Sequence, residues 1–230
     1  MSSELEVVPA GKARELGFDR SMIMSYGQDD RVCAYTSLAA MLGTDAELEK
    51  TACCLLVDKE EIGSVGATGM QSKFFENVVA EIISLEGDYN DLKLRRCLAN
   101  SKMLSSDVNA GYDPLFADAF EKKNASFCGR GVVFSKFTGS RGKSGSNDAN
   151  AEYIAKLRKI MDDNNVHYQM AELGKVDVGG GGTIAYIMSL YGMEVIDCGV
   201  AILNMHAPWE IASKADVYEA KKCYEAFLKN

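Results

Sequence analysis

Residues 193–201 read MEVIDCGVA, an apolar stretch that predicts a β-strand. Three further stretches predict strands, at 51–58, 102–108 and 131–137. The first of these, TACCLLVD, is a continuous apolar run, which is typical of a strand that is covered on both faces.

Helical patterns alternate with these strands along the chain. Apolar residues recur at helical spacing in five stretches, at 32–42, 71–85, 151–162, 183–191 and 215–228. Strands that alternate with helices indicate an α/β fold. We therefore expect a three-layer sandwich in which helices flank a mixed, largely parallel sheet. In such sheets, ligands bind outside the carboxyl ends of the strands.

The composition narrows the classes of function. The chain has 230 residues, of which 47% are hydrophobic, and this is enough for one domain with its own core. The net charge of −8 argues against a nucleic acid or a membrane surface as partner, because both attract a basic face. The longest stretch without a charge, 178–193, is too short to span a bilayer. The seven cysteines include no CxxC pair, which indicates reduced thiols and a cytoplasmic protein.

Acidic residues and one histidine lie near the ends of the predicted strands or before the first helix. In chain order they are Asp29, Asp30, Glu60, Glu61, Asp107 and His206. If the strands are parallel, these groups gather at one edge of the sheet. Carboxylates that lie close together repel one another unless a cation sits among them. Carboxylates with one imidazole suit zinc, manganese or cobalt.

Each of these residues also has a plainer interpretation. The two aspartates fit a helix N-cap, the two glutamates fit a solvated loop, and Asp107 fits a turn. His206 fits a loop histidine, and His167, which has no acidic context, is interpreted as structural. The sequence contains no short ligand motif such as HExxH, so spacing alone leaves these alternatives open.

Two glycine-rich stretches are similar to phosphate-binding sites. GSRGKSGS at 139–146 is similar to a phosphate-binding loop, but Phe137 stands where the pattern requires its first glycine. DVGGGGTIA at 177–185 could seat an anion at a helix start, and a tight turn beside a binding cleft is the preferred interpretation. Both stretches are therefore weak indications of a phosphate or nucleotide site.

Five stretches, taken in order, resemble one known family. They are GQDDRVCAYTSL (27–38), VDKEEIGSVGATG (57–69), SSDVNAGYDP (105–114), GGGGTIAYIMSLYG (179–192) and MHAPWEIASKAD (205–216). Together they are similar to the aspartyl aminopeptidase/vacuolar aminopeptidase I family of zinc metallopeptidases. The resemblance covers nearly the whole chain and corresponds to the second part of a full-length member.

The resemblance implies a role for each candidate residue. Family members hold two Zn²⁺ ions, and Asp29 matches the aspartate that bridges them. Glu61 matches a ligand of one ion, Asp107 matches a ligand of the other, and His206 matches the final histidine ligand. The implied general base is Glu60, which would take a proton from water and later give it to the leaving amine. A substrate-contacting lysine corresponds to Lys136.

The same resemblance implies an aminopeptidase that removes N-terminal amino acids from peptides and forms homo-oligomers. It divides the chain into 1–28, the tail end of an N-terminal or inserted region, and 29–230, part of a metallopeptidase catalytic domain. A further zinc-ligand histidine of the family lies before this stretch, so we expect one fair and one incomplete metal site. The alternative is a non-catalytic remnant or split subunit that acts in oligomer assembly or regulation.

Three positions depart from aspartyl aminopeptidases near the substrate. Ala110 replaces a substrate-contacting histidine, a second family histidine falls on Asp113, and a family tyrosine is replaced by Lys143. A preference for acidic N-terminal residues therefore does not follow from the resemblance.

Overall fold

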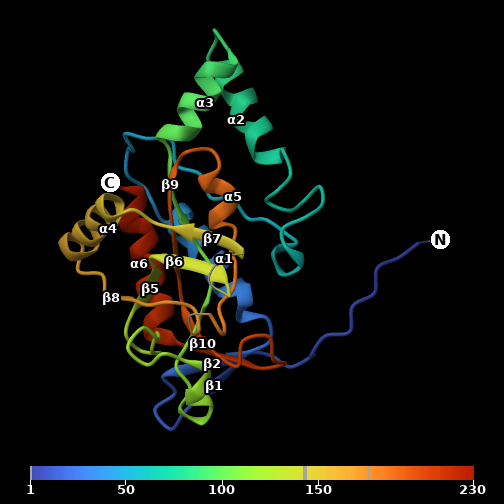
Figure 1. Ribbon diagram of the computed structural model, residues 1–230, viewed down its shortest axis with the longest axis vertical. Helices are drawn as coiled ribbons and strands as arrows, with labels where there is room; N and C mark the ends of the chain where they lie inside the picture. The colour runs from blue at the N-terminus through green and yellow to red at the C-terminus, as the bar shows by residue number, and fades with distance from the viewer. Residues whose placement is uncertain (1, 142–143, 176) are drawn as a thin grey trace.

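A computed structural model describes residues 2–141, 144–175 and 177–230, so Lys143 lies outside the described residues (Figure 1). The helices are α1 (Gln28–Leu42), α2 (Phe74–Leu85), α3 (Asp91–Asn100), α4 (Ala151–Asp163), α5 (Ala185–Ser189) and α6 (Lys214–Leu228), with 3₁₀ turns at Glu60–Ile62 and Pro114–Ala119. The strands are β1 (Arg14–Leu16), β2 (Met22–Ser25), β3 (Lys102–Ser105), β4 (Asn109–Ala110), β5 (Val132–Ser135), β6 (Phe137–Ser140), β7 (Ser144–Asp148), β8 (Tyr168–Met170), β9 (Glu194–Gly199), β10 (Ala201–Leu203) and β11 (Glu210–Ser213).

One sheet has four strands in the order β3-β9-β5-β8. Strand β9, which comes from the stretch MEVIDCGVA, pairs parallel to β3 and antiparallel to β5, and β5 pairs parallel to β8. The sheet is therefore mixed and largely parallel, as the sequence predicts.

Side chains of β9 alternate between two apolar clusters. Ile196 and Cys198 are buried with side chains of α1, α4 and α6. Val195 is buried instead with side chains of α2, α3 and α5. Because successive side chains of a strand point to opposite faces, helices cover both faces of β9. The predicted three-layer α/β arrangement is confirmed.

A second sheet has the order β1-β2-β11-β10-β4, and only its β10–β4 pair is parallel. Strand β10 follows β9 almost directly, and the loop from β10 to β11 carries His206. Glu210, the first residue of β11, lies opposite Ser25, the last residue of β2. The chain continues from β2 to Asp29, so this pairing brings two segments that are far apart in the sequence side by side.

Helices α2 and α3 form an arm at the top of the molecule in Figure 1. Ile83, Leu94 and Leu98 are buried within this arm and against α5 and β9. Other apolar side chains of the arm remain exposed, namely Phe74, Val78, Ile82, Leu85 and Leu92. In the part of the chain that the structure describes, no helix is long and apolar enough to cross a bilayer.

The predicted strand at 51–58 is wrong. This stretch has no regular secondary structure and pairs with no described strand. Leu55 and Val57 pack against the cluster of α2, α3 and α5, whereas Leu56 between them is exposed. The run thus buries alternate side chains by packing alone, without the backbone partners that a strand requires.

Other predicted elements differ in their bounds. The stretch 131–137 divides into the end-to-end strands β5 and β6, and the helix predicted at 183–191 is limited to α5. Several elements were not predicted, namely α3, β1, β2, β4, β7, β8 and β11. These strands are only two to five residues long, and mixed sequences of that length carry little periodic signal.

Candidate metal centre

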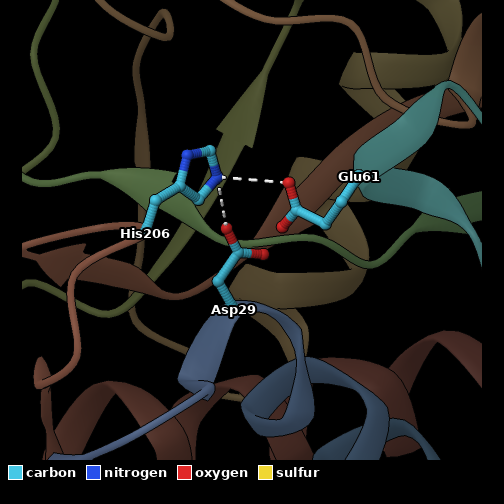
Figure 2. A group of neighbouring side chains, drawn as sticks. All are labelled: Asp29, Glu61 and His206. Atoms are coloured by element: carbon cyan, nitrogen blue, oxygen red, sulfur yellow. Dashed lines mark ion pairs between the residues drawn. The ribbon is translucent and has the colours of Figure 1, made fainter. Parts of the chain in front are cut away.

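Three of the predicted ligands converge on one point (Figure 2). The His206 Nε2 atom lies 3.0 Å from Asp29 Oδ2 and 3.4 Å from Glu61 Oε2. One potential ligand atom from each residue lies within 4.8 Å of the other two. The three side chains come from segments that are far apart in the sequence, so the fold itself assembles this group.

Asp29 is placed by the start of α1. The Gln28 side-chain amide donates hydrogen bonds to the carbonyl oxygens of Ile23 and Glu210, at 3.0 and 2.7 Å. Regular helical dihedral angles begin only after Asp30, so Asp29 lies in a bend between β2 and the helix proper. Its side chain is 9% exposed.

Glu61 is placed by a single 3₁₀ turn, Glu60–Ile62. Lys59 and Gly63 on either side have φ values of 68° and 86°, and the Ser64 N–H donates to the Lys59 carbonyl at 2.7 Å. This tight reversal orients Glu61 toward His206 (Figure 2). The Glu61 side chain is 56% exposed, in contrast to Asp29.

His206 lies in the β10–β11 loop with a φ of 65°, a left-handed conformation that is uncommon outside glycine. Its N–H donates to Glu210 Oε1 at 2.8 Å. Its imidazole is 63% exposed and faces the two carboxylates. Strained backbone of this kind persists where the surrounding contacts hold it, and it clusters at functional sites.

The carboxylates around Asp29 raise one another's pKa. Burial, followed by the charge of Glu61, raises the pKa of Asp29 to about 7. Burial likewise raises the pKa of Asp30 to about 8, and burial and the charge of Glu61 raise that of Glu60. Burial and the charge of Asp30 hold the pKa of Asp107 well above its ordinary value. A cation among these groups would offset both the repulsion and the desolvation.

The convergent donor set fits zinc. Zn–N and Zn–O bonds are about 2.0–2.2 Å, so tetrahedral ligand atoms lie roughly 3.4 Å apart. The two distances from His206 Nε2 are close to that separation, and imidazole and carboxylate groups are both zinc ligands. The geometry therefore accommodates an ion without a large rearrangement.

Two other predicted site residues, Asp107 and Lys136, are not members of this trio. Asp107 follows β3 and lines a narrow cavity with Asn109, Thr183 and Asp197. Burial, followed by the charges of Asp30, Glu60 and Asp29, raises the pKa of Asp107. Among the described residues it is not one of the three convergent ligands. Lys136 is exposed and pairs with Asp148 rather than with the trio.

His167 agrees with its structural interpretation. It is exposed, its backbone N–H donates to Glu219 Oε2 at 2.8 Å, and its carbonyl accepts from Val132. Glu210 is a further residue at this site that was not predicted, and its carboxylate accepts from the backbone N–H groups of both Asp29 and His206. In the sequence, Glu210 is distinguished only by its position four residues after His206. That position does not indicate a contact with Asp29 unless the β11–β2 pairing is known.

The comparisons with known proteins agree with the fold and the donor set. Residues 1–228 match the family described as Aminopeptidase I zinc metalloprotease (M18). A protein of Clostridium acetobutylicum named "Probable M18 family aminopeptidase 1" is 67% identical over 230 residues, covering 100% of this chain and 49% of that protein.

Two solved structures are also similar. The crystal structure of aminopeptidase I from Clostridium acetobutylicum superposes with a TM-score of 0.89 at 65% identity, over 97% of this chain and 48% of that one. The M18 family aminopeptidase structure from Thermotoga maritima gives a TM-score of 0.92 at 44% identity, over 96% of this chain and 49% of that one. The chain thus spans about half the length of the relatives it matches.

Proposed function

Because the chain belongs to the Aminopeptidase I zinc metalloprotease (M18) family, we propose that it carries metal-binding and catalytic residues of a zinc-dependent aminopeptidase that removes N-terminal amino acids from peptides. The observation that supports this most directly is the convergence of His206, Asp29 and Glu61. In this proposal, residues 29–230 belong to the catalytic domain and 1–28 to a preceding region, although β1 and β2 pair into the sheet that carries His206.

The proposal gives each ligand a task. Asp29, Glu61 and His206 would hold one Zn²⁺, and Asp29 with Asp107 would contribute to a second. The bound metal would supply a Lewis acid that polarises the scissile carbonyl and lowers the pKa of water. The three side chains point toward one another (Figure 2), so an ion held among them would fix where the substrate carbonyl can lie.

Glu60 is proposed as the general base. It is adjacent to the ligand Glu61 in the same turn and, being half-buried, has a pKa raised above its ordinary value by burial. A carboxylate whose pKa moves toward neutrality is better matched to taking a proton from water and returning it to the leaving amine. Its side chain is not one of the three convergent ligands, so its carboxylate is free to move that proton.

Substrate contacts are the least constrained part of the proposal. The exposed ammonium group of Lys136, which pairs with Asp148, would exchange that partner for a carboxylate or carbonyl of a peptide. Ala110 and Asp113 stand where aspartyl aminopeptidases have histidines, so we do not assign a preferred N-terminal residue. A cytoplasmic location is also proposed, from the seven free cysteines.

The test uses the two histidines of the chain as a matched pair. Purified wild-type chain, His206→Ala and His167→Ala are equilibrated with Zn²⁺, and bound metal is measured by elemental analysis. Loss of bound zinc is expected for His206→Ala only. Equal zinc content in all three proteins would remove His206 as a ligand. Activity is then measured with Zn²⁺ or Co²⁺ and a panel of chromogenic aminoacyl substrates.

A second candidate function is assembly without catalysis, as a remnant or split subunit that associates with copies of itself. It is supported by the apolar side chains that the α2–α3 arm exposes, including Ile82 and Leu85. Light scattering separates the two candidates. A discrete oligomer with no hydrolysis of any substrate in the panel would favour assembly, and hydrolysis that depends on Zn²⁺ would favour the peptidase.

A further inference from the structure

Glu210 is a buried carboxylate that hydrogen-bonds to two of the convergent residues at once. Glu210 is only 2% exposed to solvent. Oε2 accepts from the Asp29 N–H at 2.9 Å, and Oε1 accepts from the His206 N–H at 2.8 Å. Within the residues that the structure describes, no lysine or arginine forms an ion pair with it. Both oxygens of this carboxylate are thus used to join two backbone segments.

We propose that Glu210 is a positioning residue that fixes Asp29 and His206 relative to each other so that their side chains can share one metal ion. This inference rests on the proposed metal site. Glu210 does not contact the metal in this account; it acts through the backbone of the two ligands. Partners of this outer kind orient ligands and tune metal affinity.

The position of Glu210 in the second sheet explains why it can do this. It begins β11 directly opposite Ser25, the last residue of β2, and the chain then bends through Gln28 to Asp29. The Glu210 main-chain carbonyl accepts from Gln28 Nε2 at 2.7 Å. Both the main chain and the side chain of Glu210 are therefore tied to the segment that presents Asp29.

The other segment has few contacts of its own. The β10–β11 loop places Asn204 and His206 at φ values of 60° and 65°. Its internal backbone bond joins the Ala207 N–H to the Asn204 carbonyl, at 2.9 Å. Non-glycine residues in the left-handed region carry a conformational cost, so the loop relies on outside contacts to stay in this shape. The bond from His206 to Glu210 is such a contact.

The carboxylate is the side chain that this geometry requires. Two N–H donors converge on it, and an ionised carboxylate offers acceptors only. In Glu210→Gln, one oxygen becomes an NH₂ group, which cannot accept from either Asp29 or His206. One of the two segments would lose its anchor, and a donor would face a donor. Loss of an outer-shell partner typically weakens metal affinity by about 10–100-fold.

Asp216 provides a matched control. It is fully buried, and its two oxygens accept from the N–H groups of Gly129 and Gly131, at 2.6 and 2.7 Å. The chemistry is the same as at Glu210, but the two anchored residues are not among the predicted ligands. Asp216→Asn should therefore destabilise the fold in a similar way without a specific effect on metal binding.

The experiment compares wild type, Glu210→Gln and Asp216→Asn. Zn²⁺ affinity is measured by competition with a chromophoric chelator, and the unfolding midpoint of the metal-free chain is measured by circular dichroism. We expect both variants to have lower midpoints, and only Glu210→Gln to lose about 10–100-fold in affinity. Equal affinities in the two variants would overturn the positioning role while leaving the metal site intact. A wild-type chain that binds no Zn²⁺ would overturn the proposed function and this inference together.

Hydrogen exchange of the wild-type chain provides a second test if Glu210→Gln does not fold. Opening the Glu210 bonds would separate the two ligands, so bound Zn²⁺ should slow amide exchange at Asp29 and His206. The amides of Gly129 and Gly131, anchored by Asp216, should not gain this protection. Unchanged exchange at His206 with Zn²⁺ bound would contradict the proposal.

Discussion

The two carboxylates that face His206 are held in opposite ways. Asp29 is 9% exposed and lies in a bend that is anchored by Gln28 and Glu210. Glu61 is 56% exposed and depends on one 3₁₀ turn, closed by the bond from Ser64 to Lys59. The candidate centre thus has two halves. Asp29, in a bend anchored to the second sheet, is the fixed half, and Glu61, in a surface turn, is the adjustable half. The fixed half should set metal affinity, and the turn should be free to serve the reaction.

The largest expected effect is a loss of turnover when Glu60, in the 3₁₀ turn beside Glu61, is replaced. Glu60→Gln removes the proposed general base, and general-base catalysis contributes about 10²–10⁴-fold. We expect turnover to fall by that factor while zinc content is unchanged, because Glu60 is not among the convergent donors. The same substitution at the matching glutamate of the Clostridium acetobutylicum relative tests the role in a longer protein.

The control for this experiment is Glu86→Gln, which changes an exposed glutamate at the end of α2. It should leave turnover as it is. Near-normal turnover of Glu60→Gln, with zinc content intact, would exclude Glu60 as the base.

The next effect concerns the fixed half. Asp29→Asn removes a ligand rather than an outer partner, so Zn²⁺ affinity should fall by more than about 100-fold, beyond the range of outer-shell changes. In the metal-free chain the same substitution should raise the unfolding midpoint at neutral pH, because it removes a buried charge that faces Glu61. Chelator competition and circular dichroism measure the two quantities. A lower midpoint together with normal affinity would show that Asp29 is structural.

A smaller loss is expected for the adjustable half. Glu61→Gln should weaken Zn²⁺ binding by only about 10-fold, because the exposed turn can move its remaining oxygen toward the metal, whereas the bend that holds residue 29 cannot adjust. Its exposed side chain makes little contribution to stability, so the metal-free midpoint should stay within about 2 °C of wild type. If Glu61→Gln and Asp29→Asn weaken binding equally, the distinction between a fixed and an adjustable half is wrong.

The smallest effect is the pH dependence of the metal-free chain. Burial raises the pKa of Asp29 to about 7 from 3.8, so between these values the folded state binds more protons than the unfolded state. Stability that is present at the lower pH is therefore lost as pH rises through this window. We expect the temperature of the unfolding midpoint to fall by roughly a few degrees when the pH is raised from about 5 to about 8. Asp29→Asn should flatten this slope, and an identical slope in wild type and variant would contradict it.

Three strands of the four-stranded sheet could be predicted from the sequence because they are apolar, whereas β8, only three residues long, could not. MEVIDCGVA became β9, with helices on both faces, and 102–108 and 131–137 also supplied strands. The stretch 51–58 is just as apolar but packs without a strand partner. An apolar composition predicts that a segment will be buried. Whether its backbone also hydrogen-bonds to a neighbouring strand depends on the tertiary structure.

The candidate site was only partly predictable. Acidic residues near strand ends pointed to a cation, and the family resemblance selected Asp29, Glu61, Asp107 and His206 as ligands. The structure places Asp29, Glu61 and His206 together. Their roles, and those of Glu60, Asp107 and Lys136, stay predictions. Glu210 could not be predicted, because its role depends on the pairing of β11 with β2. Both strands are short and of mixed composition, so the sequence does not indicate that they pair.

The most direct test of the central claim is an anomalous diffraction measurement at the zinc absorption edge on crystals of this chain grown with Zn²⁺. We expect an anomalous difference peak about 2.0–2.2 Å from His206 Nε2, from a carboxylate oxygen of Asp29 and from a carboxylate oxygen of Glu61. Zinc bound only elsewhere on the chain, with no peak beside His206, would contradict it.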